Sequence, residues 1–209
     1  MEYFFPAITI GIIAFLAAVS PGPDFIVVAK NSLNARKIGL MTALGVGLGI
    51  LVHVAYSLLG IGLIISQSII LFSIIKYVGA AYLLYLGIQL VRTKKESFKE
   101  ISVEKGDGNI SLSQALKEGF ITNALNPKAT LFFLSIFTQV IDVKTPLIVQ
   151  GMYGIEIAFI VGIWFSLLAF IISAPLVRNK FSKVQYYLSK IMGVALVAFG
   201  IKLALQNQK

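Results

Sequence analysis

One segment of the sequence restricts the fold of this chain more than any other. Residues 38–75 contain no Asp, Glu, Lys or Arg. Because a membrane-spanning helix needs about 20 residues, this run predicts one span, a turn near residues 66–68 and the start of a second span. The whole chain follows the same trend, since 57% of its 209 residues are hydrophobic and 13% are charged. A soluble domain carries roughly 25% charged residues, so we expect an integral membrane protein.

The other apolar runs extend this interpretation to an all-α bundle. They are too long for the strands of a membrane β-barrel and lack the alternation of such strands. Each run has the length of about one transmembrane helix. The predicted spans are residues 3–28, 38–65, 69–91, 116–141, 147–177 and 187–205.

A polar segment divides the six predicted spans into two sets of three. We expect a first three-helix repeat at residues 1–91, a loop at 92–115 and a second three-helix repeat at 116–209. Because three is odd, the second set enters the membrane from the opposite side to the first. Any repeat between the two sets must therefore be inverted.

Basic residues predict how the bundle is oriented. Most of them follow the first, third and fifth spans, whereas the opposite side carries only Lys76, Lys144, Lys202 and Lys209. The positive-inside rule then places the 92–115 loop in the cytoplasm and both termini outside. This distribution also accounts for the net charge of +9, so we do not expect a nucleic-acid partner.

The composition and the motifs exclude several classes of function. The chain has no cysteine and one histidine, which excludes thiol redox chemistry and a multi-histidine metal centre within one chain. No phosphate-binding glycine loop and no Gly-x-Ser-x-Gly nucleophile turn occur in the sequence. We therefore expect neither an enzyme nor a cofactor or a metal.

The first motif that could carry function interrupts the first predicted span. Its residues are Ser20, Pro21, Gly22, Pro23 and Asp24. The two prolines remove backbone donors and the glycine relaxes the chain, so the helix is predicted to break. Free N–H groups at the new helix start suit a carboxylate, and the Asp24 carboxyl suits an ammonium group or a proton. The alternative is a kink near the membrane interface with a solvated aspartate.

The second motif interrupts the fourth predicted span, in the corresponding place of the second half. Its polar and helix-breaking residues are Asn123, Asn126, Pro127 and Lys128. The two asparagines are one helical turn apart and can face one cavity. Lys128 could meet a substrate carboxylate or pair with Asp24, or it could extend to the lipid headgroups. Interrupted helices at corresponding positions of two halves are the best sequence indication of a transport site.

Two more ionisable residues lie within predicted spans. His53 is a candidate for proton coupling, although a lone histidine is more often a packing residue with its hydrogen bonds satisfied. Glu156, in the outer part of the fifth span, could relay protons or bind an amine, or could lie near the interface with little role. Together with Asp24 these residues are our proton-coupling candidates.

The motifs, taken together, resemble the LysE/RhtB family of amino-acid exporters. The resemblance rests on residues 20–24, on the Gly79-Ala80-Ala81-Tyr82-Leu83-Leu84-Tyr85-Leu86-Gly87 segment and on residues 120–129, in this order. It implies export of amino acids or similar small zwitterions from a prokaryotic cytoplasm across the plasma membrane, driven by the proton motive force. It also implies a homodimer as one assembly, and a histidine at the position of His53.

The lead hypothesis from the sequence is thus a secondary exporter. Asp24 and Lys128 would bind opposite ends of a zwitterion, and one half would rock against the other to alternate access. The alternative on the same scaffold is an exporter of another small solute or of a cation. A non-transporting partner subunit is a further alternative.

Overall fold

The computed structural model describes residues 3–67, 69–94, 110–141 and 144–205, and this part of the chain is helical without any strand. The all-α class predicted from the sequence is therefore confirmed for these residues. Most of the predicted 92–115 loop, and Ser68 of the predicted turn, lie outside the described residues. The helices are α1 (Phe4–Val19), α2 (Pro23–Asn34), α3 (Arg36–Gln67), α4 (Ile69–Arg92), α6 (Leu112–Ala124), α7 (Pro127–Gln139), α8 (Leu147–Ile172) and α9 (Pro175–Leu205).

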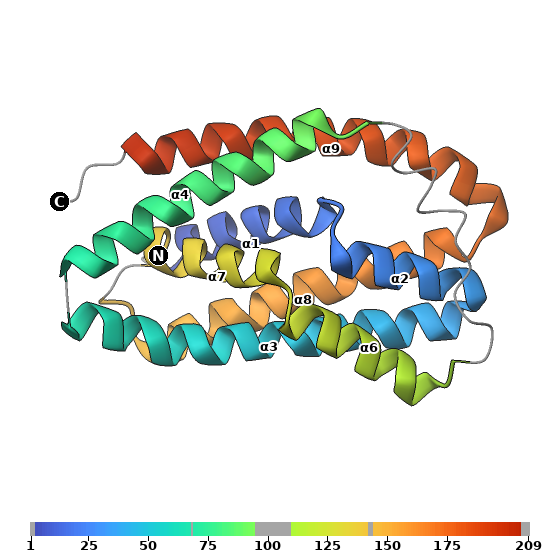
Figure 1. Cartoon of the computed structure of the whole chain (residues 1–209), viewed down its shortest axis with the longest axis horizontal. Coiled ribbons are helices and arrows are strands. Elements are labelled where there is room, and N and C mark those ends of the chain that lie inside the picture. The colour runs from blue at the N-terminus through green and yellow to red at the C-terminus, as the bar shows by residue number, and fades with distance from the viewer. Residues whose placement is uncertain (1–2, 68, 95–109, 142–143, 206–209) are drawn as a thin grey trace.

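The long helices run roughly parallel to one another along the long axis of the molecule (Figure 1). Helices α3 and α8 pack together on one side, and α4 and α9 pack together on the other. The short helices α1, α2 and α7 lie between these pairs, where α1 contacts α8 and α9, and α7 contacts α3 and α4. The interrupted helices therefore occupy the centre of the bundle.

The first interruption is a sharp bend between α1 and α2. The two helix axes differ by 60°. Pro21 and Pro23 lack the N–H groups that would continue the helical ladder, and Gly22 is fully extended with φ −176° and ψ −173°. Pro23 is the first residue of α2, a position where proline is favourable. The break predicted at residues 20–24 is confirmed.

The second interruption separates α6 from α7. Helix α6 ends at Ala124, and α7 begins at Pro127 after the N-cap residue Asn126. The Asn126 side chain accepts a hydrogen bond from the backbone N–H of Lys128, which satisfies one free donor of the new helix. The break predicted in the fourth span is confirmed.

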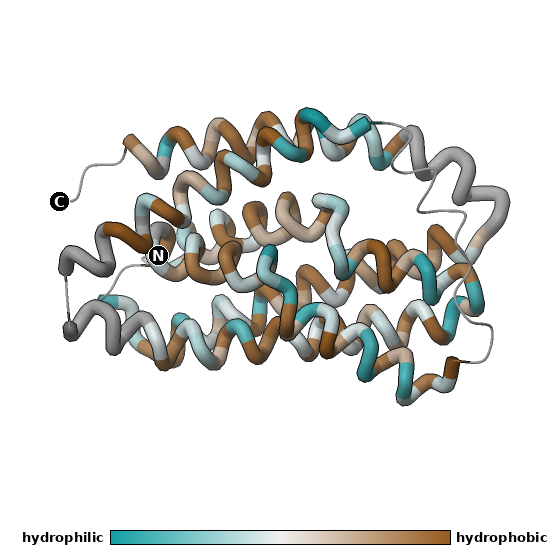
Figure 2. Tube along the Cα trace, in the orientation of Figure 1, coloured by the Kyte–Doolittle hydropathy of each residue, from teal (hydrophilic) through white to brown (hydrophobic). Residues whose placement is uncertain are grey.

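Three of the described helical segments are long and apolar enough to cross a membrane, and the bent α1/α2 pair counts as a fourth if it is one span. The three segments are Arg36–Gly60, Leu147–Ile172 and Val184–Lys202. Apolar residues dominate these helices, whereas hydrophilic residues gather where α2 ends and α6 begins (Figure 2). The chain is thus consistent with a multi-pass membrane protein. The six-span count and the inverted repeat stay predictions.

Glycines allow α3 and α6 to approach closely. A Cβ atom at Gly45 would overlap the backbone carbonyl of Leu116, and one at Gly119 would overlap the carbonyl of Thr42. A Cβ atom at Gly49 would lie 2.8 Å from Oδ1 of Asn123. Small residues thus place the end of α6 directly against α3, as is common between membrane helices.

We expect Gly49→Ala to impair transport and Gly47→Ala to leave it unchanged. The methyl group at position 49 would displace Asn123, at a cost of about 1–3 kcal/mol for an overpacked site. Gly47 lies in the same helix, but its Cβ would meet its nearest neighbours, on α8, at 3.7 Å. The measurement is the thermal unfolding midpoint in detergent together with transport in proteoliposomes. Equal behaviour of the two variants would show that the Gly49 contact is unimportant.

Candidate functional site

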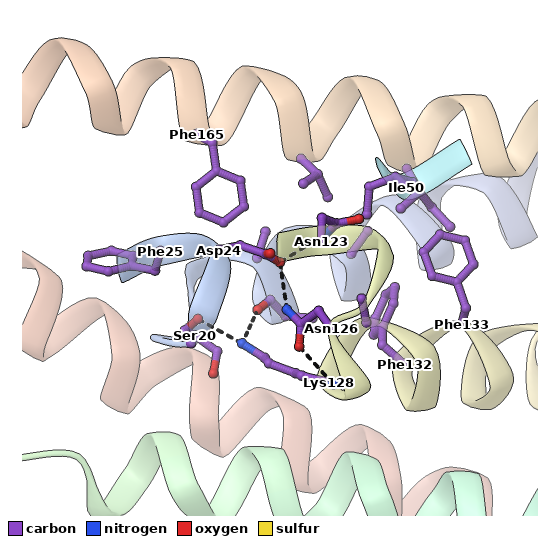
Figure 3. Close-up of a pocket in the computed structure, with 17 residues that line it drawn as sticks. Ser20, Asp24, Phe25, Ile50, Asn123, Asn126, Lys128, Phe132, Phe133 and Phe165 are labelled. Carbon is purple, nitrogen blue, oxygen red and sulfur yellow. Dashed lines mark hydrogen bonds between the residues drawn. The ribbon is translucent and has the colours of Figure 1, made fainter. Parts of the chain in front are cut away.

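The two breaks meet in the centre of the bundle (Figure 3). Oδ2 of Asp24, at the start of α2, accepts hydrogen bonds from Nδ2 of Asn123 and from Nδ2 of Asn126, both at 2.9 Å. These two amides come from opposite sides of the α6/α7 break. The residues that the sequence singled out in the two halves, about 100 positions apart, thus form one cluster.

The orientation of the Asn126 amide is fixed by its role as the N-cap of α7. Its Oδ1 accepts the Lys128 N–H at 3.0 Å, so its Nδ2 must face Asp24 and donate. Asp24 itself lies in the first turn of α2, where a helix N-terminus favours negative charge. The carboxyl group is therefore held in place by two donors and a helix dipole.

Two acceptor atoms of this cluster stay unpaired among the described residues. They are Oδ1 of Asp24 and Oδ1 of Asn123, and both are buried. A buried acceptor without a donor costs about 1–3 kcal/mol, so such atoms are rare unless water or a ligand satisfies them. The Asp24 side chain lines the cavity, so its free oxygen offers a binding place for an N–H donor, whereas Oδ1 of Asn123 faces Gly49 of α3.

The Lys128 ammonium group lies on the other side of the first break. It donates to the carbonyl of Ser20 at 2.8 Å and to that of Ala17 at 3.2 Å. The Ala17 carbonyl lacks its usual helical partner because Pro21 has no N–H, and it also accepts the Ser20 N–H at 3.2 Å. These carbonyls form the C-terminal, negative end of α1, which favours a cation. Among the described residues, Lys128 forms no direct ion pair with Asp24, and its third N–H has no partner.

Pro127 frees a carbonyl in the second break in the same way. The carbonyl of Asn123 would bond to the N–H that Pro127 lacks; it accepts the Asn126 N–H at 2.8 Å, and Nε2 of His53 also lies 2.8 Å from it. Because a carbonyl only accepts, Nε2 must carry the hydrogen, and Nδ1 lies 2.7 Å from the Tyr56 hydroxyl. His53 is fully buried and stacked on Phe133. Both ring nitrogens of neutral His53 have a hydrogen-bond partner. The protonated ring would keep both hydrogen bonds if the Tyr56 hydroxyl accepts from Nδ1.

Pro23 frees the third carbonyl, that of Val19. Nε2 of Gln185 on α9 donates to it at 2.9 Å. Gln185 is fully buried, and its Oε1 is a further buried acceptor without a partner in the described part of the chain. Each of the three helix-breaking prolines is thus compensated by a side chain from another helix. This arrangement holds the irregular backbone at membrane depth without leaving these carbonyls unpaired.

The cluster opens onto a small cavity. The cavity has a volume of about 40 Å³ and its polar lining includes Ser20, Asp24, Asn123, Asn126 and Lys128. Its remaining walls are alanine, isoleucine, valine and phenylalanine side chains with Gly22. Since one water molecule needs about 10–15 Å³ in such a cavity, there is room for about three. The site is therefore a small, mainly apolar cavity with a few polar groups in its wall.

A second polar cluster closes the bundle beyond the cavity. Nδ2 of Asn31 on α2 donates to Glu118 Oε2 on α6 at 2.8 Å and to Thr42 Oγ1 on α3 at 2.9 Å. Lys30 Nζ lies 3.9 Å from Glu118 Oε1. Asn31 is only 1% exposed. The Asn31–Glu118 hydrogen bond thus links α2 to α6 at this end of the molecule, and we call it the Asn31–Glu118 latch.

Glu156 does not belong to the cavity. Its carboxyl group packs against Gly11 of α1, and a Cβ atom added at Gly11 would lie 2.8 Å from Oε1 of Glu156. The next residue, Ile157, lines the cavity, but Glu156 does not. The structure therefore does not bring Glu156 together with Asp24.

A family model described as LysE type translocator matches residues 15–207. The chain belongs to this family. The resemblance predicted from residues 20–24, 79–87 and 120–129 is thereby confirmed, and the chain is a translocator and not an enzyme.

Two of three curated relatives of this LysE-type translocator match nearly its whole length, and the third matches about two thirds of it. The uncharacterized membrane protein YrhP of Bacillus subtilis is 33% identical over 201 residues, covering 92% of this chain and 95% of the relative. The threonine efflux protein of Escherichia coli is 28% identical, covering 96% and 98%. The leucine efflux protein of Salmonella choleraesuis is 36% identical over 136 residues, covering 64% and 62%. No solved structure gives a significant match.

Sequence reasoning missed one residue of the LysE-type site, Gln185. The sixth span was predicted at residues 187–205, whereas α9 begins at Pro175. Gln185 therefore lay in a predicted loop, where a glutamine is unremarkable. No sequence spacing links Gln185 to Val19, because their contact depends on how α9 packs against the end of α1.

Proposed function

We propose that this LysE-type translocator is a secondary exporter of amino acids or similar small zwitterions. The observation that supports it most is the cluster at the two breaks. Its unpaired acceptor in the cavity, Oδ1 of Asp24, suits an α-ammonium group. The remaining N–H of Lys128 suits a carboxylate. The two ends of a zwitterion would each find a complementary group in one cavity.

The size of the cavity implies that it must widen to bind substrate. An amino acid such as threonine has eight non-hydrogen atoms, whereas about 40 Å³ accommodates roughly three water molecules. The cavity therefore has to open before a substrate of this size can bind. Substrate would enter when the two halves move apart on one side, and leave when they move apart on the other.

The helix contacts support six crossings related by an inverted repeat. Helix α3 of the first half packs on α6 and α7 of the second, whereas α8 of the second half packs on α1 and α2 of the first. Both breaks also share one order, with an N-cap residue, a proline and then an ionisable residue, namely Asp24 or Lys128. In this proposal α1/α2 and α6/α7 each form one interrupted crossing.

The orientation in the plasma membrane follows from the basic residues. The ends of α2 and α6 that carry the Asn31–Glu118 latch would face the cytoplasm, with both termini outside. Opening toward the cytoplasm would then require the latch to break. A reporter that is inactive outside the cytoplasm, fused to the C-terminus, should stay dark; activity would reverse the proposed orientation.

Coupling to protons is the remaining element of the proposal. Asp24 is the first candidate because it lies in the cavity, and His53 is the second because its ring can be hydrogen-bonded in both protonation states. Glu156 is a weaker candidate because it lies outside the cavity. The homodimer stays a prediction from the family resemblance.

A counterflow assay in proteoliposomes tests the proposed function. The names of two relatives make threonine and leucine the first substrates to try. We expect preloaded unlabelled amino acid to drive entry of the labelled one, and an imposed pH gradient to drive net transport. No exchange of any amino acid, or exchange of a metal cation instead, would overturn the proposal.

A further inference from the structure

A polar stripe follows one face of α4, a helix that the proposed mechanism does not use. Tyr82, Tyr85, Gln89 and Arg92 recur at intervals of three and four residues, which places them on one side of the helix. The Tyr85, Gln89 and Arg92 side chains are exposed. Gln89 Nε2 donates to the Tyr85 hydroxyl. An exposed polar stripe on an otherwise apolar helix needs an explanation.

The stripe begins at the central site. The Tyr82 hydroxyl donates to the backbone carbonyl of Lys128 at 3.2 Å. One turn further, Tyr85 and Gln89 line a groove of about 500 Å³ together with Pro21 of the first break. The groove thus runs from the segment that Lys128 contacts to the surface of the bundle.

The outer end of the groove is cationic. Arg92 and Lys94 line it, and Lys190 donates to the adjacent Val91 carbonyl. No acidic residue is among the described residues that line the groove. This end lies at the C-terminal end of α4, on the side that is predicted to face the cytoplasm. A groove lined by cations attracts anionic groups and raises their local concentration.

The exposed amide of Gln89 favours a water-filled groove over a lipid-filled one. Facing hydrocarbon, an amide with an unsatisfied N–H and carbonyl would cost several kcal/mol. Water in the groove satisfies these groups and also solvates a zwitterion on its way to the break. The contact with Pro21 distinguishes this groove from an isolated basic surface patch.

We propose that this groove is the cytoplasmic vestibule of the translocator, where Arg92 and Lys94 capture the carboxylate of the substrate before it reaches Lys128. The inference rests on the proposed function and adds a second, weaker carboxylate subsite to it. The Tyr85–Gln89 pair guides the zwitterion along α4 toward the break. Loss of this carboxylate subsite should raise KM, because more substrate is needed to fill the site. It should leave the maximal rate unchanged, because the subsite takes no part in the conformational change.

The test compares an R92Q/K94Q variant with the parent in inverted membrane vesicles, whose outer face is the cytoplasmic one. Initial uptake rates of labelled threonine and leucine are measured against concentration. We expect KM to rise roughly tenfold, the effect of losing a charge-assisted contact to the carboxylate, with the maximal rate unchanged. Higher ionic strength should raise the KM of the parent and leave that of the variant unchanged.

The matched control is K117Q, which removes an exposed basic residue of α6 that does not line the groove. It should keep the KM of the parent. An unchanged KM in R92Q/K94Q, with a parent that transports, overturns the vestibule and leaves the proposed function intact. A dependence of the parent on anionic lipid that R92Q/K94Q loses, without a change in KM, also overturns it and identifies a lipid site. A parent that transports no amino acid overturns both.

Discussion

Replacing Asp24 by asparagine is expected to abolish export while leaving the protein inserted and folded. The side-chain oxygen of the new amide can still accept from Asn123 and Asn126, so both hydrogen bonds across the breaks are kept. Its NH₂ group then takes the place of the buried, unpaired Oδ1. The cavity would present a donor where the ammonium group of the substrate needs an acceptor.

The expected loss in counterflow is at least about tenfold, since a hydrogen bond to a charged group contributes about 1.5–3 kcal/mol. The matched control is Glu156→Gln, which neutralises an acid within a predicted span but outside the cavity. It should retain counterflow, because exchange needs no proton coupling. Normal export by Asp24→Asn with an unchanged KM would rule out the proposed binding mode.

Replacing Lys128 by methionine should have the second largest effect, on stability as well as on transport. The change removes the side-chain donor to the carbonyls of Ala17 and Ser20, of which only the Ala17 carbonyl keeps a backbone donor, the Ser20 N–H at 3.2 Å. An unsatisfied buried carbonyl at Ser20 costs about 1–3 kcal/mol, so the unfolding midpoint in detergent should fall. Counterflow should be lost.

A second variant separates the two roles of Lys128. In Lys128→Gln the amide can donate to one or both carbonyls, but the positive charge is gone. We expect most of the stability to return while counterflow stays at least about tenfold below the parent. If Lys128→Gln exchanges amino acids with the KM of the parent, the ammonium group has a structural role only.

The interruptions themselves could be predicted from the sequence because their cause is local. Pro21, Pro23 and Pro127 each remove one N–H within an apolar run, and this alone determines where the helices break. The charged residue after each break, Asp24 or Lys128, was also recognisable, since charge at membrane depth is costly. These features needed no knowledge of the packing.

The partners of the freed carbonyls could not be predicted, because they depend on packing between distant helices. His53 was recognised as a candidate, but its bond to the Asn123 carbonyl depends on the close approach of α3 and α6 at Gly49. The direct pairing of Asp24 with Lys128 was one of the options from the sequence. In the structure the Lys128 ammonium group instead donates to the carbonyls of Ala17 and Ser20 at the end of α1.

The position of Glu156 shows the same limit. Helical periodicity places it on α8 next to a cavity residue, yet its side chain turns toward Gly11 on α1. Only the packing of α1 on α8 decides which face of the helix meets the cavity. The sequence thus predicted the two motifs that form the site and left their surroundings open.

The most direct test of the central claim uses the absence of cysteine from the chain. Ala129 lines the cavity at the junction of the two breaks, and Ala129→Cys would place a single thiol there. If the junction is a substrate site with alternating access, a membrane-impermeant maleimide should label the thiol from either face, and substrate should slow the labelling. Labelling from one face only, at a rate that no amino acid changes, would contradict the account.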